Sequence, residues 1–284
     1  MAFKSPVGEI VRQRYSCRSY ALKPIAEAER RGLSEFLEAN TQGPFGTRAR
    51  FSLVAATGQD AEALKGLGTY GFIKHPAGFI VGAVEESPGD MEDYGYLMEK
   101  AILAATDLGL GTCWLGGTFS KSSFAKKIGL RQGETVPAVA ATGYPAESDK
   151  GKPDPGRRFP WPELFSRETF GNAMTPEQSG AYAEPLEMVR LAPSATNKQP
   201  WRIVRSGDAW HFYLKRTKGY GKGSLLFRLL RIADLQRVDL GIAMCHFELS
   251  AREFGLDGRW VVEEPDLGKP EEEVEYTVTW QQAG

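Results

Sequence analysis

The fold is decided by a stretch that occurs twice, as DYGYLMEKAILAATDLGLGTCW at 93–114 and as DLGIAMCHFELSAREFGLDGRW at 239–260. The copies align without gaps at an offset of 239 − 93 = 146 residues. Matching aspartate, glycine and tryptophan positions indicate an internal repeat, the alternative being two buried helices that resemble each other by chance. The matched pairs are Asp93/Asp239, Gly95/Gly241, Met98/Met244, Leu103/Leu249, Ala105/Ala251, Gly109/Gly255, Leu110/Leu256 and Trp114/Trp260.

Each copy has the pattern of a helix. In the first, Tyr94, Leu97, Ala101 and Leu108 recur at helical spacing, and Gly109 follows as the residue that ends the helix. Apolar runs typical of strands precede and follow each helix. These runs are 51–56, 78–84 and 136–145 in the first half, and 201–204, 209–214 and 273–280 in the second.

Strands and helices in this order predict an α+β fold made of two tandem halves, 1–165 and 166–284. The boundary is expected within 147–175, where the prolines of KPDPG at 152–156 and FPWP at 159–162 interrupt regular structure. At 284 residues the chain is long enough for one large domain or two smaller ones.

Composition excludes several classes of function. Hydrophobic residues make up 42% and charged residues 25%, and the net charge of −1 argues against a nucleic-acid binder. No run approaches the roughly 18 apolar residues of a membrane helix, and the N-terminus lacks a signal-peptide pattern, so we expect a cytoplasmic protein without a membrane partner. Three scattered cysteines and three histidines argue against disulfides and a metal site.

Two polar segments carry candidate chemistry. In an extended segment Arg14, Ser16 and Arg18 lie on one side, and two guanidinium groups beside a hydroxyl suit a phosphate, unless these side chains simply face water. The second segment, LAPSATNKQPW at 191–201, places small and amide residues between prolines. Such a loop can edge a flat heterocycle, or it can be a plain polar connection.

At these residues the chain resembles the nitroreductase-like flavoproteins. That family carries an Arg-x-Ser-x-Arg/Lys start, a Pro-Ser-x-x-Asn-x-Gln-Pro-Trp loop and a Gly-Leu-Gly-x-x-Trp segment after a central helix. Its FMN lies at the interface of a homodimer, and here the corresponding parts are divided between the two halves. The resemblance therefore implies a single-chain pseudo-dimer that binds one FMN and need not dimerise. The implied FMN-binding residues are Arg14, Ser16, Arg18, Trp114, Leu115, Gly116, Gly117, Arg158, Pro193, Ser194, Ala195, Asn197 and Gln199.

Each half lacks what the other supplies. The segment 43–51 aligns with 193–201 at an offset of 150 but lacks the Ser, Asn and Gln, and no Arg-x-Ser-x-Arg opens the second half. Arg158, and after it Arg157, stands where the family usually has a further basic residue for the FMN phosphate, although a basic linker exposed to water would look the same.

The resemblance implies an FMN oxidoreductase in which the flavin carries the chemistry and no catalytic side chain is needed. NADH or NADPH would supply hydride, and a nitroaromatic or quinone would accept it in a ping-pong mechanism. Alternatives are another flavin reaction, such as dehalogenation or enoate reduction, a non-enzymatic flavin-binding or sensing protein, and a degenerate protein without cofactor. Candidate aromatic residues beside the substrate are Tyr70, Phe72, Phe119 and Tyr220, and a basic stretch at 215–222 with Arg228 and Arg231 could attract an anion.

Overall fold

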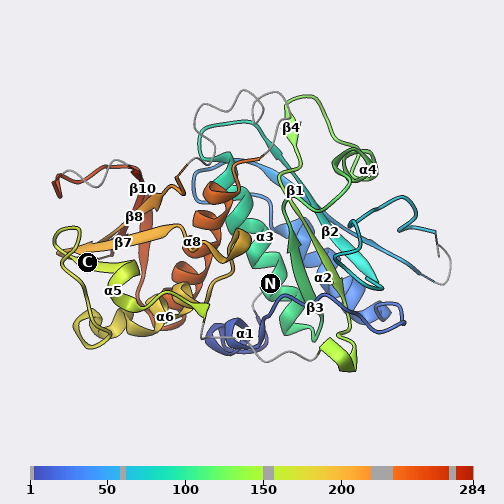
Figure 1. The fold of residues 1–284 in the computed structure, drawn as a ribbon, viewed down its shortest axis with the longest axis horizontal. Coiled ribbons are helices and arrows are strands. Elements are labelled where there is room, and N and C mark those ends of the chain that lie inside the picture. Colours follow the sequence, from blue (N-terminus) through green and yellow to red (C-terminus); the bar gives the residue numbers. More distant parts are fainter. Residues whose placement is uncertain (1–2, 58–61, 150–156, 219–232, 269–272, 284) are drawn as a thin grey trace. The chain divides into compact units, whose positions relative to one another are not determined.

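The computed structural model describes residues 3–57, 62–149, 157–218, 233–268 and 273–283. The chain forms two compact units, Met1–Pro153 and Asp154–Gly284 (Figure 1). This division lies within the range 147–175 expected for the boundary, and it precedes the expected end of the first half at residue 165. The segment before residue 165 belongs to the second unit because Arg158 and Phe159 bond residues of the loop at 191–199. β6 (Phe165–Arg167) then pairs in parallel with β7 (Trp201–Ser206).

The first unit is a five-stranded sheet with the strand order β1-β2-β5-β3, and β4 pairs with the end of β2. All of its pairs are antiparallel, with Ala49 opposite Val84 and Gly111 opposite Gly143. Its elements are α1 (Val7–Gln13), α2 (Glu27–Ala39), β1 (Ala49–Ala55), β2 (Gly78–Glu85), α3 (Asp90–Asp107), β3 (Gly111–Leu115), α4 (Lys121–Lys127), β4 (Glu134–Thr135), β5 (Val139–Gly143) and η1 (Glu147–Asp149).

The second unit repeats this order as β7-β8-β10-β9, with β6 added beside β7. Its central pairs are also antiparallel. Its elements are α5 (Trp161–Leu164), β6 (Phe165–Arg167), η3 (Glu177–Tyr182), α6 (Ala183–Leu191), η4 (Ala195–Asn197), β7 (Trp201–Ser206), β8 (Ala209–Lys215), α8 (Leu235–Glu253), β9 (Gly258–Val261) and β10 (Val274–Gln282).

The two repeated helices, α3 and α8, are the buried centres of their units. α3 contacts β1, β2 and β3, and α8 contacts β7 and β8 (Figure 1). Both are buried along most of their length, as the apolar sequence predicts for a helix covered on several sides. Gly109 and Gly255 follow them with φ of +78° and +70°, which confirms the predicted left-handed helix ends.

Each unit has its own core. In the first, Phe79, Phe119 and Phe124 make edge-to-face contacts within a buried cluster over the sheet. In the second, Phe247 on α8 stands among Trp210, Phe212, Trp260 and Trp280. The aromatic rings contribute large buried apolar areas and fix the position of each helix over its sheet.

Candidate functional site

The most unusual charged side chain of the first unit is Arg14. It follows α1 in an extended conformation and is only 7% exposed. Its Nε atom lies 3.8 Å from Oε1 of Glu99 and has no hydrogen-bond partner among the described residues. Burial lowers the pKa of Arg14, and the carboxylate of Glu99 opposes that shift. A buried guanidinium with an unused donor is suited to bind an anion.

Glu99 contacts both Arg14 and Trp114 through its carboxylate. It lies on α3 with no exposed surface, and its Oε2 accepts a hydrogen bond from Nε1 of Trp114 at 2.7 Å. One buried carboxylate therefore serves both Arg14 and Trp114, two of the residues predicted to bind FMN. Sequence reasoning missed Glu99, because a helical glutamate gives no signal that its side chain is buried.

The other residues of the predicted phosphate segment have different surroundings. Ser16 is partly buried and forms a parallel bridge to Thr112 on β3, whereas Arg18 is exposed. The backbone N–H of Arg18 donates to Asp149 at 2.5 Å, and its Nη1 donates to the carbonyl of Ser16 at 3.3 Å. The segment is thus fixed along β3, with Arg14 buried and Arg18 in solvent.

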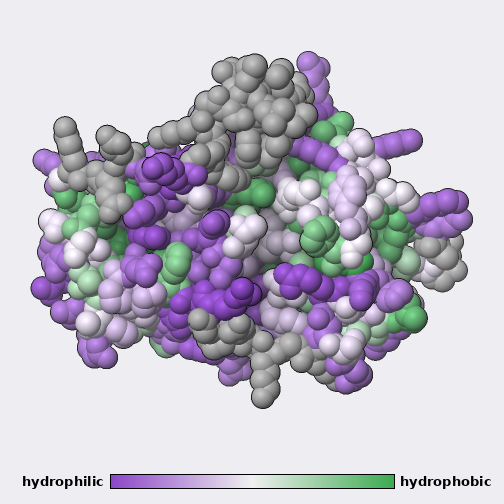
Figure 2. All heavy atoms as spheres, viewed as in Figure 1, coloured by the Kyte–Doolittle hydropathy of each residue, from purple (hydrophilic) through white to green (hydrophobic). Residues whose placement is uncertain are grey.

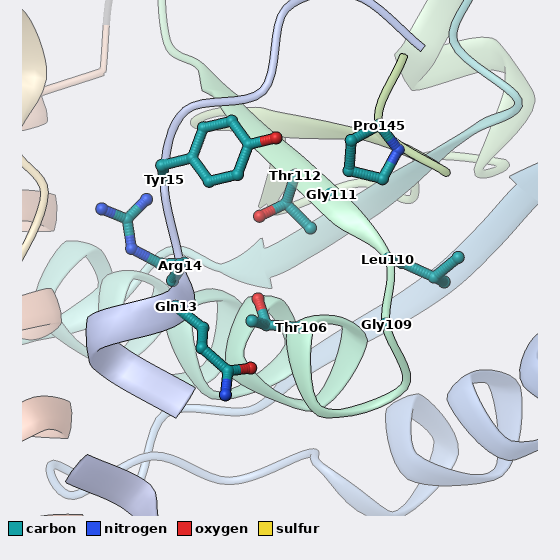
Figure 3. Close-up of a pocket in the computed structure, with 9 residues that line it drawn as sticks. All are labelled: Gln13, Arg14, Tyr15, Thr106, Gly109, Leu110, Gly111, Thr112 and Pro145. Carbon is teal, nitrogen blue, oxygen red and sulfur yellow. The ribbon is translucent and has the colours of Figure 1, made fainter. Parts of the chain in front are cut away.

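A pocket of about 150 Å³ lies in the first unit beside this segment (Figure 3). It is bounded by the Arg14 segment, the end of α3 and the start of β3. The hydroxyl of Tyr15 donates to the carbonyl of Asp149 at 2.7 Å, which fixes that wall. The pocket is lined by Gln13, Arg14, Tyr15, Thr106, Gly109, Leu110, Gly111, Thr112 and Pro145.

The end of β3 offers an open stretch of backbone. Leu115 is buried in the core, Gly116 is partly buried and Gly117 is exposed. A Cβ atom at Gly117 would meet no other heavy atom within 4 Å. The backbone here is accessible to a ligand, as a close approach to a flat ring requires.

In the second unit the predicted loop has a strained backbone. Three non-glycine residues, Thr196, Asn197 and Gln199, have positive φ of 50°, 58° and 46°. Ser194 stabilises the loop from within, because its Oγ accepts the N–H of Gln199 at 2.9 Å. Pro193 is buried, and the N–H of Ala195 donates to both carboxylate oxygens of Asp239 on α8, at 2.9 and 3.1 Å.

The segment 157–159 lies against this loop. Nη1 of Arg158 donates to Oδ1 of Asn197, and its Nη2 donates to the carbonyl of Leu191 at 2.9 Å. Oε1 of Gln199 accepts the N–H of Phe159 at 2.7 Å, and Nδ2 of Asn197 donates to the carbonyl of Arg157 at 2.9 Å. The second unit therefore brings Arg158, Asn197 and Gln199 together, with their polar groups engaged with one another and with the backbone.

The predicted aromatic and basic residues are less informative. Tyr70 and Phe72 are 71% and 58% exposed, whereas Phe119 is buried in the core, which argues against a substrate contact for it. Tyr220 and most of the basic stretch at 215–222, with Arg228 and Arg231, lie outside the described residues. Hydrophilic side chains predominate on the face in Figure 2, with scattered hydrophobic ones between them.

The described residues contain no group of side chains that could hold a metal ion. No helix in the described parts of the chain is long and apolar enough to cross a membrane.

The three cysteines are buried, and none of them forms a disulfide. His211 and His246 are buried, and each bonds a neighbour through Nδ1, Thr279 in one case and the carbonyl of Met188 in the other.

The mixed fold of helix and antiparallel sheet is that of the nitroreductases. Residues 7–251 match the protein family described as "Putative TM nitroreductase", and the chain belongs to this family. The resemblance inferred from the sequence motifs is thereby confirmed.

The chain is also similar to solved structures, one of them over nearly its whole length. The chain is similar to a putative nitroreductase from Thermotoga maritima MSB8, with 19% identity and a TM-score of 0.63, over 99% of this chain and 95% of that one. A putative nitroreductase in complex with FMN from Desulfovibrio desulfuricans has 22% identity and a TM-score of 0.43, over 56% of this chain and 95% of that one. A nitroreductase with bound FMN from Bacteroides fragilis NCTC 9343 has 24% identity and a TM-score of 0.39, over 51% and 90%. No curated protein matches the chain.

Proposed function

We propose that this chain binds one FMN and passes hydride from NADH or NADPH to a small acceptor such as a nitroaromatic or a quinone. The observation that carries the proposal is Arg14, a buried guanidinium whose Nε has an ion pair with Glu99 but no hydrogen-bond partner among the described residues. Family membership supplies the class of chemistry, and the buried cation fits the phosphate of FMN.

As the family resemblance implies, residues of both halves would take part in this binding. Arg14, with Ser16 and Arg18 nearby in the chain, holds the phosphate. The loop 193–199 would edge the flavin ring, and the bond between Arg158 and Asn197 would hold that loop in place. The backbone amides of 115–117 would be the donors to the reactive part of the ring, where donors stabilise negative charge.

When bound, FMN supplies the redox chemistry, accepting and then donating two electrons with a proton. The protein binds and orients the flavin and its partners, and no side chain of the chain has to act as acid, base or nucleophile. Donor and acceptor use the same face in turn, which gives ping-pong kinetics. The matching strand order of the two units and the repeated aspartate and tryptophan support an origin by tandem duplication, so that one chain does the work of a dimer.

Absorption spectroscopy tests the proposal. Purified protein is incubated with FMN, and unbound FMN is removed. The protein is then titrated anaerobically with NADH and afterwards with NADPH. We expect a retained flavin band that bleaches with one of the nucleotides and returns when a quinone or nitroaromatic is added. A retained flavin that neither nucleotide reduces would indicate a binding protein instead of an enzyme, and a failure to retain flavin would overturn the proposal.

A further inference from the structure

The repeated aspartate makes the same kind of contact in both units. Asp93 on α3 and Asp239 on α8 are 0% and 3% exposed, so each is a buried carboxylate. Each accepts backbone N–H groups from the loop that precedes the first central strand of its unit. A buried carboxylate requires such donors, and the loop in turn has its N–H groups satisfied.

One of these contacts occupies the same position in both loops, whereas the N–H of Asn197, at the position of Thr47, donates to the carbonyl of Ser194. Asp93 accepts the N–H groups of Phe45 and Thr47, both at 2.8 Å, and Asp239 accepts the N–H of Ala195. Ala195 follows Phe45 by 195 − 45 = 150 residues, the offset that also relates Trp201 to Phe51. The repeat thus preserves a bond between helix and loop.

The two loops differ in what this bond holds in place. The loop that Asp93 contacts contains Gly43, Phe45 and Thr47, and it lacks the serine and amide side chains of the second loop. The loop that Asp239 contacts contains Ser194 and Asn197, and three of its non-glycine residues have a left-handed backbone. Such a backbone persists only where other contacts hold it, since each of these conformations costs about 1 kcal/mol or more.

We infer that Asp239 is a positioning residue for flavin binding: through the N–H of Ala195 it holds the loop 193–199 in the conformation that meets the flavin ring. Asp93 holds the corresponding backbone of a loop without these polar groups, and it has only a structural role. This inference rests on the proposed FMN binding, and it concerns the ring and not the phosphate.

The chain supplies its own control for the test. Asp239→Ala and Asp93→Ala each remove the acceptor of loop N–H groups, and Asp239→Asn and Asp93→Asn each replace one acceptor oxygen with a donor. Affinities for FMN and for riboflavin, which lacks the phosphate, are measured by fluorescence quenching on the full chain, and stability is measured by urea unfolding.

We expect Asp239→Ala to weaken FMN and riboflavin binding alike by about tenfold, the size of one lost hydrogen bond. Asp93→Ala should lower stability at least as much, because Asp93 serves two N–H groups, and yet keep FMN affinity within about twofold. If Asp239→Ala does not fold, Asp239→Asn should still bind FMN more weakly than Asp93→Asn.

Equal FMN affinities in the Asp239 and Asp93 variants would overturn the inference and leave FMN binding intact. A loss confined to FMN, with riboflavin unchanged, would also overturn it, because the effect would then act on the phosphate. A wild-type chain that binds neither flavin would refute the proposed function itself, and the positioning role with it.

Discussion

In both units a tryptophan indole donates a hydrogen bond to a glutamate on the central helix, but the arginine that pairs with this glutamate is buried in one unit and half-exposed in the other. In the first, Trp114 donates to Glu99, whose other oxygen faces Arg14. In the second, Trp260 donates to Glu248 at 2.6 Å, and Glu248 pairs with Arg252, one turn further along α8. The side chain of Arg14 is 6% exposed and that of Arg252 is 46% exposed.

The comparison separates scaffold from site. Strand order and the loop-binding aspartates recur at matching positions in both units. Each unit also has a Trp–Glu bond, although the two glutamates differ in position, since Glu99 aligns with Cys245 and Glu248 aligns with Ile102. What differs are the side chains that a ligand could use: a buried arginine in the first unit, and a serine and amides on the loop of the second. The half-exposed guanidinium of Arg252 keeps contact with water, whereas a buried cation such as Arg14 is costly unless it has a partner.

The largest effect is expected from removing that buried cation. Arg14→Gln should weaken FMN binding by about 100-fold, since a charge-assisted contact to phosphate is lost, and it should leave riboflavin affinity within about threefold. Arg252→Gln is the matched control in the second unit and should leave both affinities unchanged. Comparable losses for FMN and riboflavin in Arg14→Gln would show that Arg14 does not act on the phosphate.

The pH dependence of stability distinguishes the buried aspartates from exposed ones. Burial raises the pKa of Asp93 from 3.8 to about 6, against the opposing hydrogen bonds from Phe45 and Thr47. The folded chain therefore keeps a proton that the unfolded chain has lost, so this contribution is complete below about pH 4 and disappears as the pH rises through about 6.

Over that interval the wild-type chain should lose about 2 to 3 kcal/mol of unfolding free energy relative to Asp93→Asn, whose side chain does not titrate. Urea unfolding at several pH values measures the difference. Asp208→Asn, at an exposed position, should follow the wild type. Parallel curves for wild type and Asp93→Asn would contradict the raised pKa.

The smallest effects are expected at the indoles. Trp114→Phe leaves Glu99, which has no exposed surface, without one of its donors, and should cost about 2 kcal/mol of unfolding free energy. Trp260→Phe should cost about 1 kcal/mol, because the side chain of Glu248 is 12% exposed and water can replace the lost donor. A larger loss of unfolding free energy for Trp260→Phe than for Trp114→Phe would contradict the argument that the more buried glutamate depends more on its indole donor.

The sequence predicted the regular elements where their pattern is strong. The helices around 93–108 and 239–254 and the strands at 51–56, 78–84 and 209–214 are present to within a few residues. It missed β3, β6 and β9, which have three to five residues each, because short strands leave too few positions for an alternation to be recognised.

The candidate site was predictable only in part. Motif spacing pointed to Arg14 and Asn197, and the resemblance placed Arg158 in the same site as Asn197, to which it is bonded. The repeat identified Asp93 and Asp239 in the sequence but did not indicate their role, since their partners are backbone N–H groups more than 40 residues away in the sequence. Glu99 could not be found, because the sequence does not reveal which helical glutamate faces inward.

The number of flavins bound per chain tests the central claim most directly. FMN bound at saturation is measured by equilibrium dialysis, with the chain concentration determined by amino-acid analysis. We predict one FMN per chain, because each unit carries only part of the set of side chains that the family uses. Two FMN per chain would contradict the division of roles between the units, and none would contradict flavin binding altogether.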